Sequence, residues 1–137
     1  MSLKNLPTLK SPEIRVGLTI GDPAGIGPAI VLKALKQLKG KAHFTVIGNS
    51  FVLSRAARAL KIKPKSFELV DLNNIKTNRF LFGRMNAEYG KASLEYLDTA
   101  MELLKKRKID CLVTCPVSKE AINLAGAKFS GHTEYLA

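Results

Sequence analysis

Short apolar, β-rich runs alternate with amphipathic segments along this chain, and this alternation restricts the fold more than any other feature. Strands are predicted at residues 14–20, 43–47, 67–72 and 109–114. Helices are predicted at 28–39, 51–60, 87–107 and 118–124, and a further helix begins near residue 131. Strands that alternate with helices favour a mainly parallel sheet flanked by helices, so the fold class is α/β.

Local signals support these helix positions. Pro28 suits the first turn of a helix and Gly40 its end. Asn49 or Ser50 can cap the second helix, and Ser118 the short helix after the last strand. Residues 73–87 are polar and predict a long loop or an irregular hairpin. Two helices show apolar stripes, expected to face a core: Ile30, Val31, Ala34, Leu35 and Leu38 in the first, and Ala92, Leu97, Ala100, Met101 and Leu104 in the long one.

Length and hydropathy indicate an ordinary globular protein. The chain has 137 residues, of which 46% are hydrophobic and 7% aromatic, and this is enough for one domain with a core. No apolar run approaches the roughly 20 residues that a bilayer requires. Residues 1–12 lack the apolar region of a secretory signal and predict a flexible leader, with the α/β part at 13–137. We therefore expect a cytoplasmic protein with no membrane partner.

Two cysteines, Cys111 and Cys115, lie four residues apart in a predicted strand. Side chains at that spacing share a face but lie roughly 13 Å apart. A disulfide needs Cα atoms within about 7 Å. Both are therefore expected to be reduced thiols.

The formal net charge of +11 is concentrated in the first half of the chain. Residues 1–65 contain 12 basic and 2 acidic residues, whereas residues 66–137 contain 10 and 9. A basic half can bind nucleic acid. Solvated helix faces and turns explain these lysines better, because no aromatic residues interleave with them to stack on bases. The residues concerned include Lys33, Lys36, Lys39, Lys61, Lys63 and Lys65.

Three segments contain candidate site residues. The turn at 21–28, Gly-Asp-Pro-Ala-Gly-Ile-Gly-Pro, follows a strand and opens a helix, where backbone N–H groups can hold an anion; Asp22 and Gly25 are its pocket candidates. The alternative is that its glycines only permit a tight turn. Lys119 begins a helix at the carboxyl end of another strand, where it can reach a phosphate or simply be solvent-exposed. His132 and Thr133, next to Gly131, can hydrogen-bond a polar substrate, although a lone histidine is more often structural.

Together these segments resemble one family. The turn at 21–28, the segment 86–100 (NAEYGKASLEYLDTA) and the segment 115–137 (CPVSKEAINLAGAKFSGHTEYLA) are similar to the 4-hydroxythreonine-4-phosphate dehydrogenases of vitamin B6 biosynthesis. The resemblance covers residues 14–137 in the same order. The turn is also similar to the Gly-Asp-Gly-Ile-Gly-Pro-Glu turn of isocitrate and isopropylmalate dehydrogenases, which implies a fold of that kind. One departure is Ala29, where the family usually has Glu or Asp.

The resemblance implies a homodimer of two-domain subunits that uses NAD or NADP and a divalent metal such as zinc, magnesium or cobalt. The implied reaction oxidises 4-phosphooxy-L-threonine to 2-amino-3-oxo-4-phosphooxybutanoate, which then loses carbon dioxide. Relatives that act on threonate or erythronate 4-phosphate are the alternative within this class. A non-catalytic basic module that binds polyanions is the alternative outside it, and nucleic acid is the less expected partner.

The family's substrate-binding His-Thr pair matches His132 and Thr133. The resemblance implies that its three metal-binding histidines lie downstream of residue 137, so no metal ligand is assigned in this chain. We accordingly expect a truncated, N-terminal portion of such an enzyme, inactive alone, whose sheet exposes an apolar edge or face.

Overall fold

A four-stranded, fully parallel sheet forms the centre of the protein. The computed structural model describes residues 13–64 and 67–137, so the predicted leader and Lys65 lie outside the described residues. The strands are β1 (Arg15–Thr19), β2 (His43–Gly48), β3 (Glu68–Asp71) and β4 (Cys111–Thr114), in the spatial order β3-β2-β1-β4. The α/β fold predicted from the sequence is confirmed.

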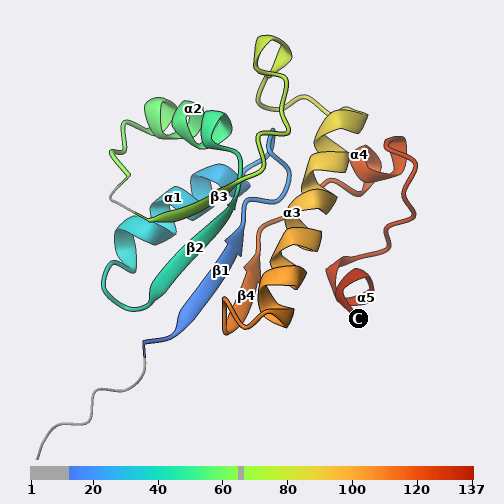
Figure 1. The fold of residues 1–137 in the computed structure, drawn as a ribbon. Coiled ribbons are helices and arrows are strands. Elements are labelled where there is room, and N and C mark those ends of the chain that lie inside the picture. The colour runs from blue at the N-terminus through green and yellow to red at the C-terminus, as the bar shows by residue number, and fades with distance from the viewer. Residues whose placement is uncertain (1–12, 65–66) are drawn as a thin grey trace, which may run out of the picture.

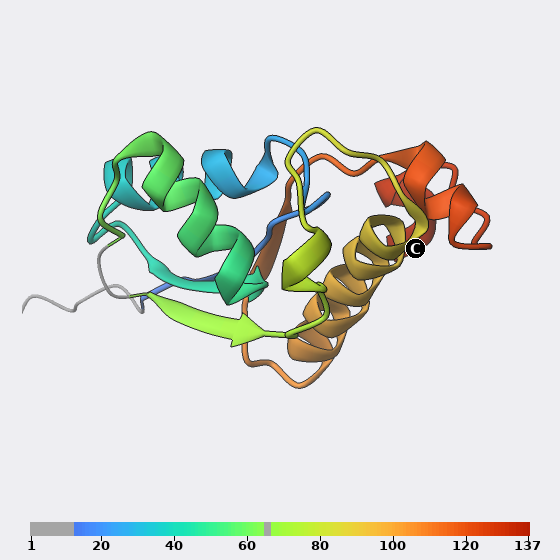
Figure 2. The same cartoon turned by 90° about the horizontal axis from the view of Figure 1, so that it is seen from above.

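Helices cover both faces of the sheet. The crossovers β1 to β2 and β2 to β3 run through α1 (Gly27–Gln37) and α2 (Ser50–Leu60), while α3 (Ala87–Lys105) leads from β3 across the sheet to β4. Figures 1 and 2 show α1 and α2 on one side of the sheet and α3 on the other. This arrangement follows from right-handed crossovers, because β2 and β3 are added on one side of β1 and β4 on the other.

The helix ends follow the local signals in the sequence. The Asn49 side chain accepts a hydrogen bond from the Val52 N–H at 3.1 Å, and Ser118 caps α4 (Lys119–Leu124) through the Ala121 N–H, also at 3.1 Å. Asn86 caps α3 in the same way. The last helix, α5, spans His132–Leu136.

The core has two parts. The main cluster lies between the sheet and its helices, and its fully buried members include Ile20, Val31, Val46 and Tyr96. A smaller cluster lies on the far side of α3, where α4 and α5 pack around Leu97, Ile122 and Phe129. The long helix α3 therefore has two buried faces. The stripe predicted for it omits the wholly buried Tyr89, Ser93 and Tyr96, while Met101 and Leu104 are only half-buried.

The apolar stripe predicted for the first helix is partly wrong. Val31 and Leu32 are buried against the sheet, but Ile30 is 42% and Leu38 44% exposed. Leu38 lies just past the end of α1, and no described residue covers either side chain. The neighbouring strand β4 is similarly open, with Val113 51% exposed. These apolar side chains agree with the expectation of an uncovered face.

The two cysteines are both free, as predicted. However, β4 ends at Thr114, so Cys115 lies just beyond the strand, and the two thiols differ in environment. Cys111 is exposed and Cys115 is buried, with its Sγ 3.7 Å from the Gly27 carbonyl oxygen. Burial raises the pKa of the Cys115 thiol to about 11.

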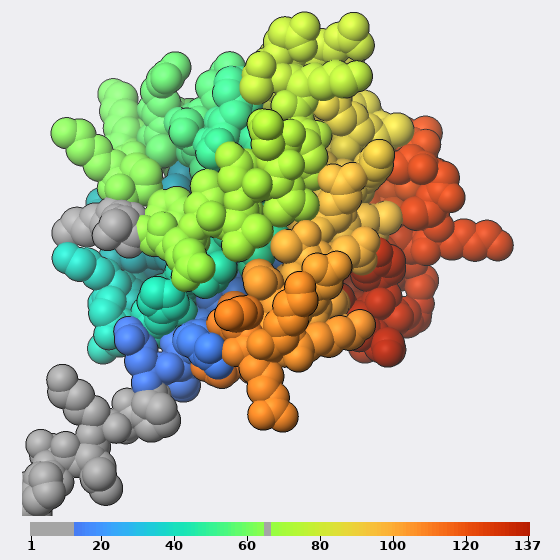
Figure 3. Space-filling model, viewed as in Figure 1, coloured from blue at the N-terminus to red at the C-terminus, as the bar shows by residue number. Residues whose placement is uncertain are grey.

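The segment predicted to be a loop, residues 73–87, is irregular as far as residue 86 apart from a short 3-10 helix, η2 (Thr77–Arg79), and Ala87 already begins α3. Figure 3 shows this segment filling the surface between α2 and α3. Phe80 anchors it, with the centroid of its ring 5.8 Å from that of Phe51 and 5.6 Å from that of Tyr89.

In residues 13–64 and 67–137, no helix is both long and apolar enough to cross a membrane.

Candidate functional site

The carboxyl ends of β1 and β4 meet at the switch point of the sheet, where strands have been added on both sides of β1. Thr19 pairs with Thr114 there. After β1 the chain leads to α1, and after β4 it leads to α4, which packs on α3 at the other face of the sheet. The loops that follow are joined directly, because the Asp22 N–H donates to the Pro116 carbonyl oxygen at 2.9 Å. Ligands of open α/β sheets bind outside such a switch point. The structure thus brings two of the three predicted segments together.

The first glycine of the turn is required by this close approach. Gly21 has φ +68°, and a Cβ atom there would overlap the Pro116 carbonyl oxygen. Gly25 differs, because its φ is unremarkable and a Cβ would meet only Asp22, at 3.3 Å from its Cβ and 3.5 Å from its carbonyl oxygen. Tight packing therefore explains Gly21 fully, and Gly25 only in part.

Asp22 turns its carboxylate back into the loop. Its Oδ1 accepts a hydrogen bond from the Ala24 N–H at 2.9 Å. Burial raises the pKa of the Asp22 carboxyl above its ordinary value, and the Ala24 N–H offsets part of that rise. Asp22 therefore stabilises the turn, and no hydrogen bond in the described residues engages its second carboxylate oxygen.

The start of α1 has no side-chain cap. Ile26 occupies the cap position, Pro28 lies in the first turn, and no acidic residue is present there. The first helical bond runs from the Ile30 N–H to the Ile26 carbonyl at 3.0 Å, so the N–H groups of Gly27 and Ala29 precede it. Such groups, together with the helix dipole, favour an anion. Because position 29 is alanine and not an acid, no negative side chain in the first turn offsets the positive end of the helix dipole, which favours a phosphate there.

The segment after β3 closes another side of this edge. The Gly83 N–H donates to the Ala24 carbonyl oxygen at 2.7 Å, which ties the segment to the turn. Arg84 follows immediately and is exposed. It is a cation beside the candidate site that the sequence did not single out, because only the fold brings residues 83–84 to residue 24.

Lys119 begins α4 at the same edge and is exposed. Its neighbour Ser118 supplies the cap, so the lysine side chain has no structural task in the described residues. Lys119 therefore has a free ammonium group at the end of the sheet where the two loops meet.

His132 and Thr133 lie elsewhere. Helix α5 packs beside the second half of α3, where the Tyr135 hydroxyl donates to Asp98 Oδ1 at 2.6 Å (Figure 1). In the described part of the chain, no hydrogen bond or ring contact joins His132 or Thr133 to Asp22, Gly25 or Lys119. The structure therefore does not gather all five candidate residues into one pocket.

The His132 ring nevertheless has an unusual environment. Its Nε2 atom is buried and lacks a hydrogen-bond partner among the described residues. The ring stands edge-on to Phe129, with centroids 5.8 Å apart. A buried polar atom without a partner is costly, because it has lost its hydration. Its missing partner can be a ligand, a water molecule or another part of a protein. Thr133, next to it, is exposed.

The described residues do not supply a metal centre. No group of three His, Cys, Asp or Glu side chains within 13–64 and 67–137 comes close enough to hold an ion. A divalent metal therefore does not fit on these residues alone.

A sheet with this strand order and two linked loops at its switch point defines a doubly wound α/β protein, and the comparisons specify the family. The model of the family described as pyridoxal phosphate biosynthetic protein PdxA matches residues 29–137. The chain belongs to this family.

Individual relatives agree with this assignment. An Oceanobacillus iheyensis protein, provisionally named D-threonate 4-phosphate dehydrogenase, is 37% identical over 139 residues, covering 89% of this chain and 42% of the relative. A 4-hydroxythreonine-4-phosphate dehydrogenase of a Sulfurihydrogenibium species is 33% identical over 135 residues, covering 90% and 42%. A crystal structure of a 4-hydroxythreonine-4-phosphate dehydrogenase from Burkholderia phymatum superposes with TM-score 0.86 at 30% identity, covering 93% and 43%. The chain thus spans about 42% of the length of the curated relatives it matches.

Proposed function

We propose that this chain forms part of the substrate site of an oxidoreductase that oxidises a phosphorylated four-carbon hydroxy acid, with NAD or NADP as hydride acceptor. The family and the names of its relatives support the reaction class. The observation in the structure that most supports the proposal is the buried, unpartnered Nε2 of His132. A substrate hydroxyl or carboxylate would supply its missing hydrogen bond.

Two substrates remain within this class. The first is 4-phosphooxy-L-threonine, oxidised to 2-amino-3-oxo-4-phosphooxybutanoate, as the name of the Sulfurihydrogenibium relative suggests. The second is D-threonate 4-phosphate, the substrate in the name of the 37% identical relative. The two differ at one carbon, which bears an amino group in the first and a hydroxyl in the second. Erythronate 4-phosphate is a third compound of the same class.

The reaction removes a hydride from the carbon that bears the substrate hydroxyl and a proton from that hydroxyl, which leaves a carbonyl. The β-keto acid then breaks its bond to the carboxylate, releases carbon dioxide and keeps the electron pair on the remaining fragment. In this proposal His132 and Thr133 orient the substrate by hydrogen bonds. The uncapped start of α1, at the same end of the sheet as Lys119, offers a separate place for a phosphate group.

The nicotinamide cofactor, when bound, accepts the hydride. Because no metal centre can be built from the described residues, none is assigned to them, and any metal would need ligands from elsewhere in the assembly. A homodimer would be one source of such groups. Sedimentation of the protein would test the dimer directly.

An assay with the complete product of the coding sequence tests the function. The DNA beyond the codon for Ala137 is sequenced first, and the whole encoded protein is then supplied with NAD or NADP and each of the three substrates. We expect cofactor reduction, followed at 340 nm, and release of carbon dioxide. His132→Gln is expected to raise KM more than it lowers kcat, because the proposed role is binding. The exposed Lys128→Gln serves as control. Absence of turnover with all three substrates under both cofactors would refute the proposal.

A further inference from the structure

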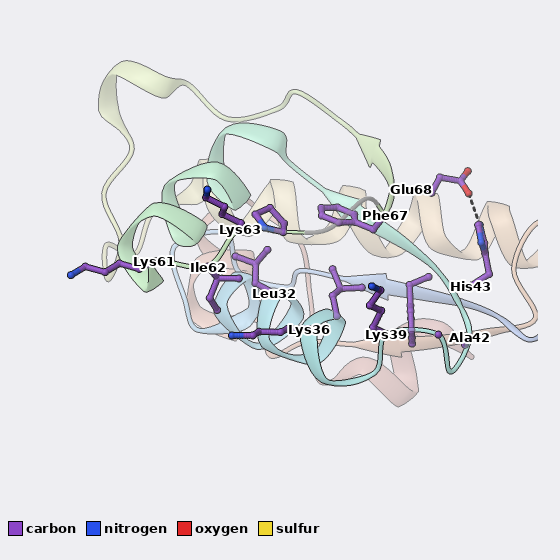
Figure 4. A pocket seen from close by; sticks show the side chains of 14 residues that line it. Leu32, Lys36, Lys39, Ala42, His43, Lys61, Ile62, Lys63, Phe67 and Glu68 are labelled. Carbon is purple, nitrogen blue, oxygen red and sulfur yellow. Dashed lines mark hydrogen bonds and ion pairs between the residues drawn. The ribbon is translucent and has the colours of Figure 1, made fainter.

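A large cavity of the described protein lies at the opposite end of the sheet from the candidate site, where the strands begin. It has a volume of about 1010 Å³ and opens between the C-terminal ends of α1 and α2 and the first residues of β2 and β3 (Figure 4). Ligand pockets commonly reach such a size. Nothing in the proposed oxidation uses this end of the sheet.

Part of its lining is hydrocarbon. The described lining includes two aromatic rings and three aliphatic side chains: Phe44, Phe67, Leu32, Leu35 and Ile62. Four of these five are only half-buried, so the fold leaves apolar surface facing the cavity. An apolar occupant would remove that surface from water.

The rim is cationic. Lys36 approaches from α1 and Lys39 from the turn after it, and Lys63 lies across the cavity from Lys36, whereas Lys61 points outward (Figure 4). The single acidic lining residue, Glu68, is already bonded to His43 at 3.0 Å. The four lysines form no ion pair within the described residues.

The ends of α1 and α2 contribute about half a negative charge each. The three ammonium groups other than that of Lys61 exceed the two helix ends and Glu68 together, so a net positive charge remains around the cavity. Part of the excess of basic residues in the first half of the sequence therefore lies around this one cavity.

We propose that this cavity binds a free amphipathic anion, namely a hydrocarbon chain of fatty-acid length with a carboxylate or phosphate head. Its tail packs on the walls formed by Leu35, Phe44 and Phe67, and its head pairs with Lys36, Lys39 or Lys63. Charge complementarity selects the anionic head, and the apolar walls distinguish this ligand from inorganic phosphate or a nucleic acid backbone.

Titration of the 137-residue chain with decanoate and dodecyl phosphate tests the proposal, with cis-parinaric acid as a fluorescent competitor. We expect saturable binding of one molecule per chain, and decanol to bind about tenfold more weakly, as expected on loss of one charge-assisted hydrogen bond. Lys36→Glu with Lys39→Glu, and separately Leu35→Glu, should each weaken binding by about tenfold or more. The three positions are exposed or half-buried, and far-UV circular dichroism verifies the fold.

The matched control is Lys105→Glu with Lys106→Glu, which makes the same change in charge at the end of α3 on the other face of the sheet. Binding should be unchanged there. Equal weakening by the control pair, or no weakening by either cavity variant, would overturn the proposal. Two further arms use anionic vesicles and duplex DNA. Binding of the chain to either one, without binding of the free amphiphiles, would also overturn it.

Discussion

Replacing Gly90 by alanine probes the contact that holds α4 against α3 and so fixes the loop after β4. Gly90 is buried in the first turns of α3, and a Cβ atom there would overlap the backbone of Ala121 at the start of α4. The overlapping atoms belong to a peptide group, which cannot rotate away as a side chain would. The variant must therefore push the two helices apart.

Two opposing terms set the size of the effect. Alanine in place of glycine within a helix stabilises by about 1 kcal/mol. Overpacking against a rigid neighbour costs about 1–3 kcal/mol, and the backbone contact favours the upper end. The net expectation is a loss of about 2 kcal/mol in the free energy of unfolding. With roughly 2.1 cal/mol/K of unfolding entropy per residue, a chain of 137 residues should lose about 7 °C in Tm.

Thermal and urea unfolding, followed by circular dichroism at 222 nm, measure both quantities. The control is Lys91→Ala, the next position on α3, which is exposed and forms only a weak pair with Glu95 at 3.9 Å. It should change stability by less than about 0.5 kcal/mol. A Gly90→Ala variant as stable as the wild type, or more stable, would show that the helices do not cross as tightly as the structure has them.

Three further predictions concern other parts of the sheet and its edges. The hydrogen bond from Arg15 lowers the pKa of the Asp110 carboxyl from 3.8 to about 2, so the ionised carboxyl stabilises the fold above pH 3.8 and loses that effect as the pH falls toward 2. Asp110→Asn should therefore make the free energy of unfolding less dependent on pH in this range. An unchanged pH dependence would count against the pair. At pH 8, Ellman's reagent should modify the exposed Cys111 quickly and the buried Cys115 only on unfolding, whereas two equally fast thiols would contradict the burial. Asn49→Ala should cost about 1 kcal/mol through loss of the α2 cap, with Asn49→Ser recovering most of it; urea unfolding decides between this result and no effect.

The strands and helices could be predicted because their signals are local. Runs of β-branched residues, Pro28, Asn49 and Ser118 act within one or two turns of their own position, and the structure keeps each role. The buried face of α3 could not be predicted as well. Tyr96 is wholly buried because α3 packs on the sheet with one face and on α4 and α5 with another. A prediction of one apolar stripe assumes that the helix packs on one partner only, and α3 has more than one.

The candidate site was predictable only in pieces. The strand-to-helix turn at Asp22 and the helix start at Lys119 follow from pattern, but their meeting depends on β4 pairing with β1 across 95 residues of sequence, as the Arg15–Asp110 pair shows. The position of His132 depends on residues 125–131, which have no periodicity to interpret. Whether His132 and Thr133 contact substrate stays a prediction, as do the roles of Asp22, Gly25 and Lys119.

The place of β4 in the sheet also has a consequence for local unfolding. β1, β2 and β3 are joined through adjacent crossovers, whereas β4 closes a far longer loop and pairs on one side only. Contacts between distant segments form late and open early. Backbone amides of β4 should therefore exchange their hydrogens sooner than those of β2. Since the loop after β4 holds the turn at Asp22, a molecule that bridges both loops would slow exchange in β4 without touching it.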